Sequence, residues 1–155
     1  MDMFTTTVIS DSTRLAIWSD HYCVWNHQHW RTAVYIPRAL VVGERTFTEE
    51  TLLQEGGLFV VLAEPGAGKT DLLNALAAIL QTSRIKASVF RNRQPAAGHH
   101  PLVIDAMDEV ARVDSLATDQ IIAQASDVTR GTVVFAGRSG EWDQGRTSYV
   151  DNVSG

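Results

Sequence analysis

Residues 64–70, EPGAGKT, have the types and spacing in this chain that best suit chemistry on a phosphate group. They nearly match the pattern G-x-x-x-x-G-K-[ST], with Ala63 in place of the first glycine. In such a loop, backbone N–H groups at a helix N-terminus surround a phosphate, and the lysine adds positive charge. Gly66 and Gly68 let the backbone approach the phosphate, whereas an alanine at the strand end is tolerated if its φ is negative. We therefore expect phosphate binding, with a plain glycine turn as the alternative.

The residues expected to bind the phosphates and cofactor span the loop and the first helical turn. Among them, the Thr70 hydroxyl is expected to reach Mg²⁺. They are Glu64, Pro65, Gly66, Ala67, Gly68, Lys69, Thr70 and Asp71.

A second acidic motif, PLVIDAMDEV, covers residues 101–110. Asp105 follows an apolar run, and an acid at the tip of a strand beside a phosphate loop can hold Mg²⁺. Asp108 and Glu109 follow within one turn. Solvated acids in a turn are the alternative, but the neighbouring phosphate loop favours a metal-binding Asp105.

Hydrophobic patterns indicate the elements that position these residues. The continuous apolar run at 58–63 predicts a buried strand, and leucines at helical spacing predict a helix over 70–81. Alternating strands and helices predict an α/β fold with a mostly parallel sheet in three layers. The remaining expected elements are a helix near 48–55, strands at 87–90, 102–104 and 132–136, and a helix at 119–125.

Together the two motifs resemble the NACHT-type branch of STAND P-loop ATPases, in which the acidic strand is followed by a small residue, an apolar residue and two further acids. By this resemblance, Asp105 organises Mg²⁺, Asp108 orients the attacking water, and Glu109 assists. The segment GTVVFAGRSGEW resembles the family's sensor strand and places Arg138 near the γ-phosphate. An arginine solvated in a loop is the alternative for that position.

The resemblance covers residues 58–142, and the family's fifth strand, helical lid and winged-helix region have no counterpart here. We therefore expect the N-terminal part of a larger switch ATPase, with residues 1–55 as an extension on a partial core at 56–155. We also expect a helix before Asp105 to be missing, because only about ten residues separate Asp105 from the strand at 87–90. The family's strand order, 5-1-4-3-2, leaves one edge of the strand at 58–63 uncovered, and we expect the N-terminal runs LAIWS and AVYIPRALVV to cover it.

The composition of the chain limits the binding partners and the cellular compartment that we expect. The chain of 155 residues has a formal net charge of −5, which argues against non-specific binding to nucleic acid or anionic membranes. Its single cysteine, Cys23, excludes an intramolecular disulfide, and we expect a cytoplasmic protein without a membrane span. The segment HYCVWNHQHW lacks a repeated C-x-x-C pair, so aromatic packing is favoured there over a metal site.

The sequence therefore predicts binding of ATP or another nucleoside triphosphate with Mg²⁺, and slow or no hydrolysis by this chain alone. Hydrolysis would follow in-line attack of water on the γ-phosphate, with Lys69 and Arg138 offsetting charge. The alternative is a non-catalytic module that binds a protein partner, or a second copy, through an uncovered sheet edge.

Overall fold

A seven-stranded sheet forms the centre of the molecule. The structure is a computed structural model that describes residues 14–18, 35–93, 97–142 and 144–154. The sheet order is β3-β2-β1-β4-β7-β6-β5. The strands are β1 (Arg14–Trp18), β2 (Leu40–Val42), β3 (Arg45–Phe47), β4 (Leu58–Leu62), β5 (Arg84–Lys86), β6 (Leu102–Asp105) and β7 (Val133–Gly137). β1, β4, β7, β6 and β5 are parallel, and β2 is antiparallel to β1 and β3, so the predicted α/β class is confirmed.

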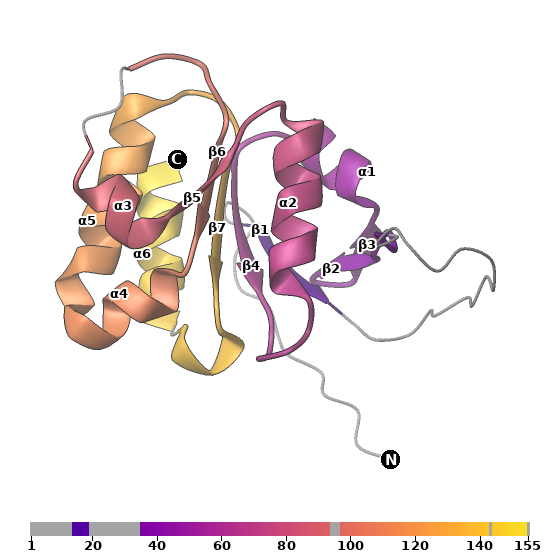
Figure 1. Cartoon of the computed structure of the whole chain (residues 1–155), viewed down its shortest axis with the longest axis horizontal. Coiled ribbons are helices and arrows are strands. Elements are labelled where there is room, and N and C mark those ends of the chain that lie inside the picture. Colours follow the sequence, from indigo (N-terminus) through magenta and orange to yellow (C-terminus); the bar gives the residue numbers. More distant parts are fainter. Residues whose placement is uncertain (1–13, 19–34, 94–96, 143, 155) are drawn as a thin grey trace.

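Helices cover both faces of the sheet and give the expected three layers (Figure 1). The helices are α1 (Glu49–Gln54), α2 (Lys69–Ile79), α3 (Ala87–Arg91), α4 (Met107–Val113), α5 (Ser115–Val128), the 3-10 helix η1 (Ser139–Glu141) and α6 (Gln144–Ser154). Along β4, Leu58, Val60 and Leu62 pack with α3 to α6. Phe59 and Val61 face the other way and pack with α1 and α2. This alternation explains why every residue of β4 is buried.

β1 covers the edge of β4 that the predicted strand order leaves open. The two strands pair in parallel, with Leu15 opposite Val60 and Ile17 opposite Leu62, while β7 pairs on the other side of β4. The described part of LAIWS therefore takes the expected place. β2, which lies within AVYIPRALVV, pairs with β1 and not with β4, and the outer strands of the described sheet are β3 and β5.

The strand predicted at residues 87–90 is wrong, because these residues form helix α3. Ala87 and Phe90 are buried three positions apart while the two residues between them are exposed, which is the spacing of a helix and not of a strand. The strand of this region is β5, which pairs with β6 just before α3. The expectation of a missing helix before Asp105 is therefore also wrong.

Two further α-helices, α4 and α6, and the 3-10 helix η1 are not among the predicted elements, and α5 is longer than predicted. α4 follows Asp105 directly, and α6 buries Thr147 and Val150 against the core. α5 extends beyond the predicted 119–125 at both ends, since Asp114 caps it by accepting a hydrogen bond from the backbone N–H of Leu116 at 3.1 Å.

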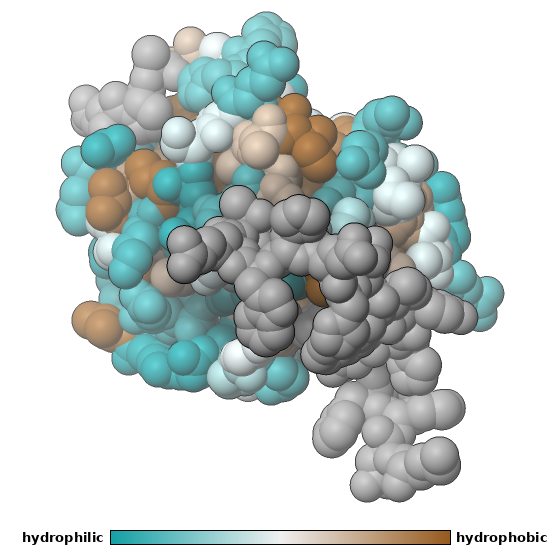
Figure 2. All heavy atoms as spheres, turned by 45° about the vertical axis from the view of Figure 1, so that its right-hand side comes forward, coloured by the Kyte–Doolittle hydropathy of each residue, from teal (hydrophilic) through white to brown (hydrophobic). Residues whose placement is uncertain are grey.

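The visible surface is mostly polar, with apolar side chains in small separate groups (Figure 2). The large apolar side chains exposed among the described residues are Ile36, Ile79, Val89, Val113 and Leu116. No helix in the described part of the chain is both long and apolar enough to cross a bilayer.

Candidate functional site

The loop between β4 and α2 has the backbone that its glycines predict. Gly66 and Gly68 have φ values of +84° and +71°, in the left-handed region that glycine adopts without strain. Gly68 is the N-cap of α2, so Lys69 and Thr70 begin the helix. Ala63 is not among the described non-glycine residues with positive φ, in agreement with the expectation that alanine is tolerated there. The loop thus presents a helix N-terminus beside the carboxyl end of a buried strand.

Lys69 joins this loop to the acidic motif. Its Nζ lies 3.6 Å from Asp105 Oδ1 and 3.6 Å from Asp108 Oδ1. The Lys69 side chain is 18% exposed, and those of Asp105 and Asp108 are 9% and 5% exposed. Charges this poorly solvated interact more strongly than a surface pair. The two motifs, far apart in sequence, therefore form one site.

Ala106, whose backbone is in the left-handed region, determines how Asp105 and Asp108 are placed relative to each other. Asp105 ends β6 and Ala106, with φ of +63°, turns the chain directly into α4. The backbone N–H of Ala106 donates to Asp105 Oδ1 at 2.7 Å, which fixes that carboxylate. The turn brings Asp108 back beside Asp105. Such a conformation is strained for a residue with a Cβ, and strain of this kind is common at functional sites.

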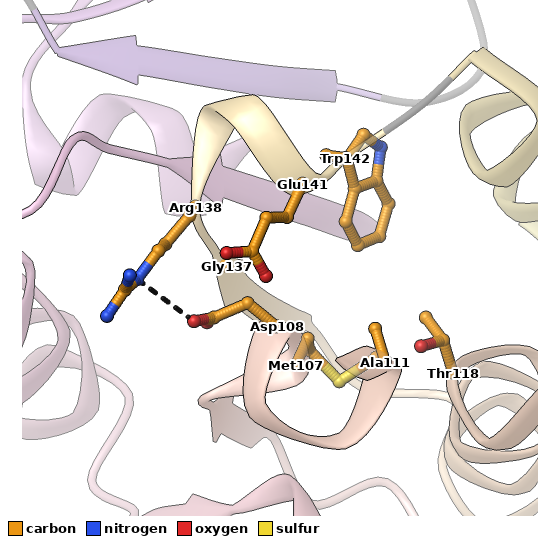
Figure 3. Close-up of a pocket in the computed structure, with 8 residues that line it drawn as sticks. All are labelled: Met107, Asp108, Ala111, Thr118, Gly137, Arg138, Glu141 and Trp142. Atoms are coloured by element: carbon orange, nitrogen blue, oxygen red, sulfur yellow. Dashed lines mark ion pairs between the residues drawn. The ribbon is translucent and has the colours of Figure 1, made fainter. Parts of the chain in front are cut away.

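Asp108 also pairs with Arg138, just after β7 (Figure 3). Arg138 Nε lies 3.1 Å from Asp108 Oδ2. Asp108 Oδ1 is buried and makes no hydrogen bond within the described structure. The positive charge of Lys69 Nζ, 3.6 Å away, still attracts this oxygen. A buried acceptor without a hydrogen-bond donor has capacity for a water or ligand proton. Glu109 is exposed on the same turn, so of the two predicted acids Asp108 is the one in the site.

Arg84 is a site residue that the sequence did not predict. Its Nη1 lies 2.5 Å from Asp105 Oδ2. With Lys69 and Arg138 it gives three cations around the two buried carboxylates. A surplus of positive charge suits a polyphosphate ligand.

Arg38 is a second unpredicted neighbour of the loop. Its Nη1 donates to the carbonyl of Gly68 at 2.6 Å. Its backbone N–H donates to the buried Glu49 at 3.1 Å, and the Tyr35 hydroxyl donates to the same carboxylate oxygen. Burial, and then the bond to Glu49, raise the pKa of Tyr35 well above its usual range. The segment before β2 is thus anchored on α1, with the Arg38 guanidinium against the glycine-rich loop.

The 3-10 helix η1 links the loop to α4. The Ser139 hydroxyl donates to Glu64 at the start of the loop. Glu141 accepts hydrogen bonds from Arg112 on α4. Arg138, immediately before η1, is therefore held between the glycine-rich loop and the helix that carries Asp108.

Asp108 is one of the residues that line a small pocket, which Figure 3 draws. Its cavity volume is about 10 Å³, close to the least that admits one water, so it is too small for a nucleotide. It is lined by Met107, Asp108, Ala111, Thr118, Gly137, Arg138, Glu141 and Trp142.

The residues expected to hold Mg²⁺ are compatible with that ion but do not form a cage. Thr70 is exposed in the first turn of α2, and Asp105 lies beside Lys69. Asp71, expected to bind the cofactor, is exposed in the same turn. The described residues contain no group of three or more His, Cys, Asp or Glu side chains suited to a metal. Mg²⁺ commonly uses only one or two carboxylates together with substrate phosphates, so a small donor set fits it. The cluster His21, Cys23, His27 and His29 lies outside the described residues.

No protein-family model, curated protein or solved structure matches this chain. The site is therefore interpreted from its own geometry.

Proposed function

We propose that this chain binds ATP or another nucleoside triphosphate together with Mg²⁺, as the nucleotide-switch core of a STAND-type ATPase. The observation that carries the proposal is the position of Lys69, 3.6 Å from both Asp105 and Asp108. A glycine-rich loop, a helix N-terminus and a lysine beside strand-end carboxylates are the parts that recognise a Mg²⁺-bound polyphosphate.

In this proposal the chain mainly positions and neutralises the phosphates. Loop N–H groups at the start of α2 bind one phosphate, and Lys69 and Arg138 offset the charge of the terminal one. Asp108 Oδ1, buried without a hydrogen-bond donor, accepts a hydrogen bond from the attacking water and orients it. Thr70 and Asp105 are the residues that would hold Mg²⁺, which supplies charge neutralisation between phosphate oxygens when bound.

The test is the effect of Mg²⁺-ATP on thermal unfolding. A ligand that binds only the folded state stabilises it by about 2.7 kcal/mol at a hundredfold excess over Kd. Lys69→Ala should abolish this stabilisation. Arg130→Ala is the control, because Arg130 is exposed and precedes β7, at the opposite end of the strand from Arg138. Equal melting shifts in wild type and Lys69→Ala would refute the proposal.

We further propose that hydrolysis by this chain is slow. The pocket that the described residues form beside Asp108 is too small to enclose a nucleotide, and water exclusion is one of the ways in which an active site speeds phosphoryl transfer. Phosphate release by the chain should stay below about 1 s⁻¹, the low end of ordinary enzymes. Faster release would show a complete catalyst.

A further inference from the structure

Arg84 occupies an unusual position for a residue beside a metal-binding carboxylate. It begins the edge strand β5, and in the pairing of β5 with β6 it lies opposite Val103. Its side chain nevertheless reaches along the strand to Asp105, and Nη1 lies 2.5 Å from Oδ2. Arg84 is 30% exposed at the side chain, whereas Asp105 is only 9% exposed. The cation can therefore move toward solvent more easily than the carboxylate can.

Both oxygens of Asp105 are already engaged. Oδ1 accepts the Ala106 N–H at 2.7 Å and lies 3.6 Å from Lys69 Nζ, and Oδ2 is paired with Arg84. The carboxylate is thus balanced by two side-chain cations. A divalent cation placed beside Asp105 would repel a guanidinium in contact with the same carboxylate, and the repulsion is poorly screened at a site this buried.

We propose that Arg84 competes with Mg²⁺ for Asp105, so that Mg²⁺-nucleotide binds only when the guanidinium leaves the carboxylate. Arg84 is then an internal counterion of Asp105 in the ligand-free protein and sets the Mg²⁺ concentration at which the nucleotide is held. The inference rests on the proposed function and adds a control of metal affinity to it. The opposite role, a supporting partner that orients Asp105 for the metal, predicts the opposite change when Arg84 is removed, because loss of such a partner typically lowers metal affinity about 10- to 100-fold.

The test is a Mg²⁺ titration at fixed ATP, followed by the rise in melting temperature of the full chain. Each variant is compared with its own ligand-free melting temperature, so that a change in basal stability does not enter the midpoint. Arg84→Gln should lower the Mg²⁺ midpoint about tenfold, which corresponds to about 1.4 kcal/mol. Arg84→Lys keeps the charge and should leave the midpoint closer to that of the wild type.

Two controls test whether a change in the Mg²⁺ midpoint arises from the contact between Arg84 and Asp105. Arg91→Gln removes an arginine that also pairs with a carboxylate, Asp114, but outside the site, and should leave the midpoint unchanged. In an Asp105→Asn background, Arg84→Gln should have no further effect on the midpoint, because the group for which Arg84 competes is gone. An unchanged or raised midpoint for Arg84→Gln in a chain that binds Mg²⁺-ATP would overturn the inference alone. A wild type that Mg²⁺-ATP fails to stabilise would overturn the proposed function and the inference with it.

Discussion

Gly68→Ala is expected to destabilise the nucleotide-free protein by about 2–3 kcal/mol. An L-residue held in the left-handed region costs about 1–2 kcal/mol, and Gly68 has φ of +71°. A Cβ at this position would also lie 2.4 Å from Arg38 Nη2. The guanidinium can swing away, but it then loses its 2.6 Å hydrogen bond to the Gly68 carbonyl, worth about 1 kcal/mol.

Gly66→Ala is the matched control for this prediction. Gly66 also has positive φ, +84°, but a Cβ there would meet nothing within 4 Å. Its substitution should therefore cost only the backbone strain of about 1–2 kcal/mol. In an Arg38→Ala background the extra cost of Gly68→Ala should disappear, so a double-mutant cycle should give a coupling of about 1 kcal/mol.

Urea unfolding without nucleotide measures all of these free energies, since a change in the midpoint at constant m reports stability. Equal costs for Gly66→Ala and Gly68→Ala, or a cost of Gly68→Ala that Arg38→Ala leaves unchanged, would refute the argument that Arg38 packs on the loop.

Three further outcomes are expected. Asp108→Asn should keep nucleotide binding but lower any turnover, whereas Asp105→Asn should also weaken its Mg²⁺ dependence. Phosphate-release and melting assays test this, and a larger loss of turnover with Glu109→Gln than with Asp108→Asn would show that the acid is misassigned. Deletion of residues 1–45 removes β1 and β2 and therefore exposes the edge of β4. It should cause aggregation or dimerisation in size-exclusion chromatography. A soluble monomer would contradict the inference that β1 protects this edge. Thr118→Val should raise the unfolding free energy by about 1 kcal/mol in urea, because the buried Thr118 Oγ1 has no hydrogen-bond partner among the described residues; a loss of stability would indicate a bound water.

The parts of the fold that local patterns specify were predictable from sequence. The continuous apolar run of β4, the glycines of the loop and the leucine spacing of α2 each identify their element within a few residues. β5 is not apparent from the sequence because it is short and carries two charges at a sheet edge, and α6 because its sequence, QGRTSYVDNVS, is mostly polar. Short elements of this kind are stabilised by the packed core rather than by their own pattern.

The residues of the site likewise divide into those that a local motif marks and those that only the assembled fold brings together. Lys69, Asp105 and Asp108 belong to motifs whose spacing alone marks them, and the structure places them together. Arg84 and Arg38 contact the site across sequence separations of 21 and 30 residues, without a motif of their own. Their roles depend on strand pairing and on the path of the segment before β2, which only the assembled fold provides.

The pairing of β4 with β1 also has a consequence for biosynthesis. β4 has two neighbours in the sheet, and β7 lies far downstream in the chain, whereas β1 lies upstream. Parallel pairing between distant segments forms slowly, and N-terminal segments are synthesised first. A nascent chain can therefore pair β4 with β1 while β7 has yet to leave the ribosome. Substitutions that weaken β1 should thus reduce the yield of folded protein in cells more than they reduce the stability of protein that has already folded.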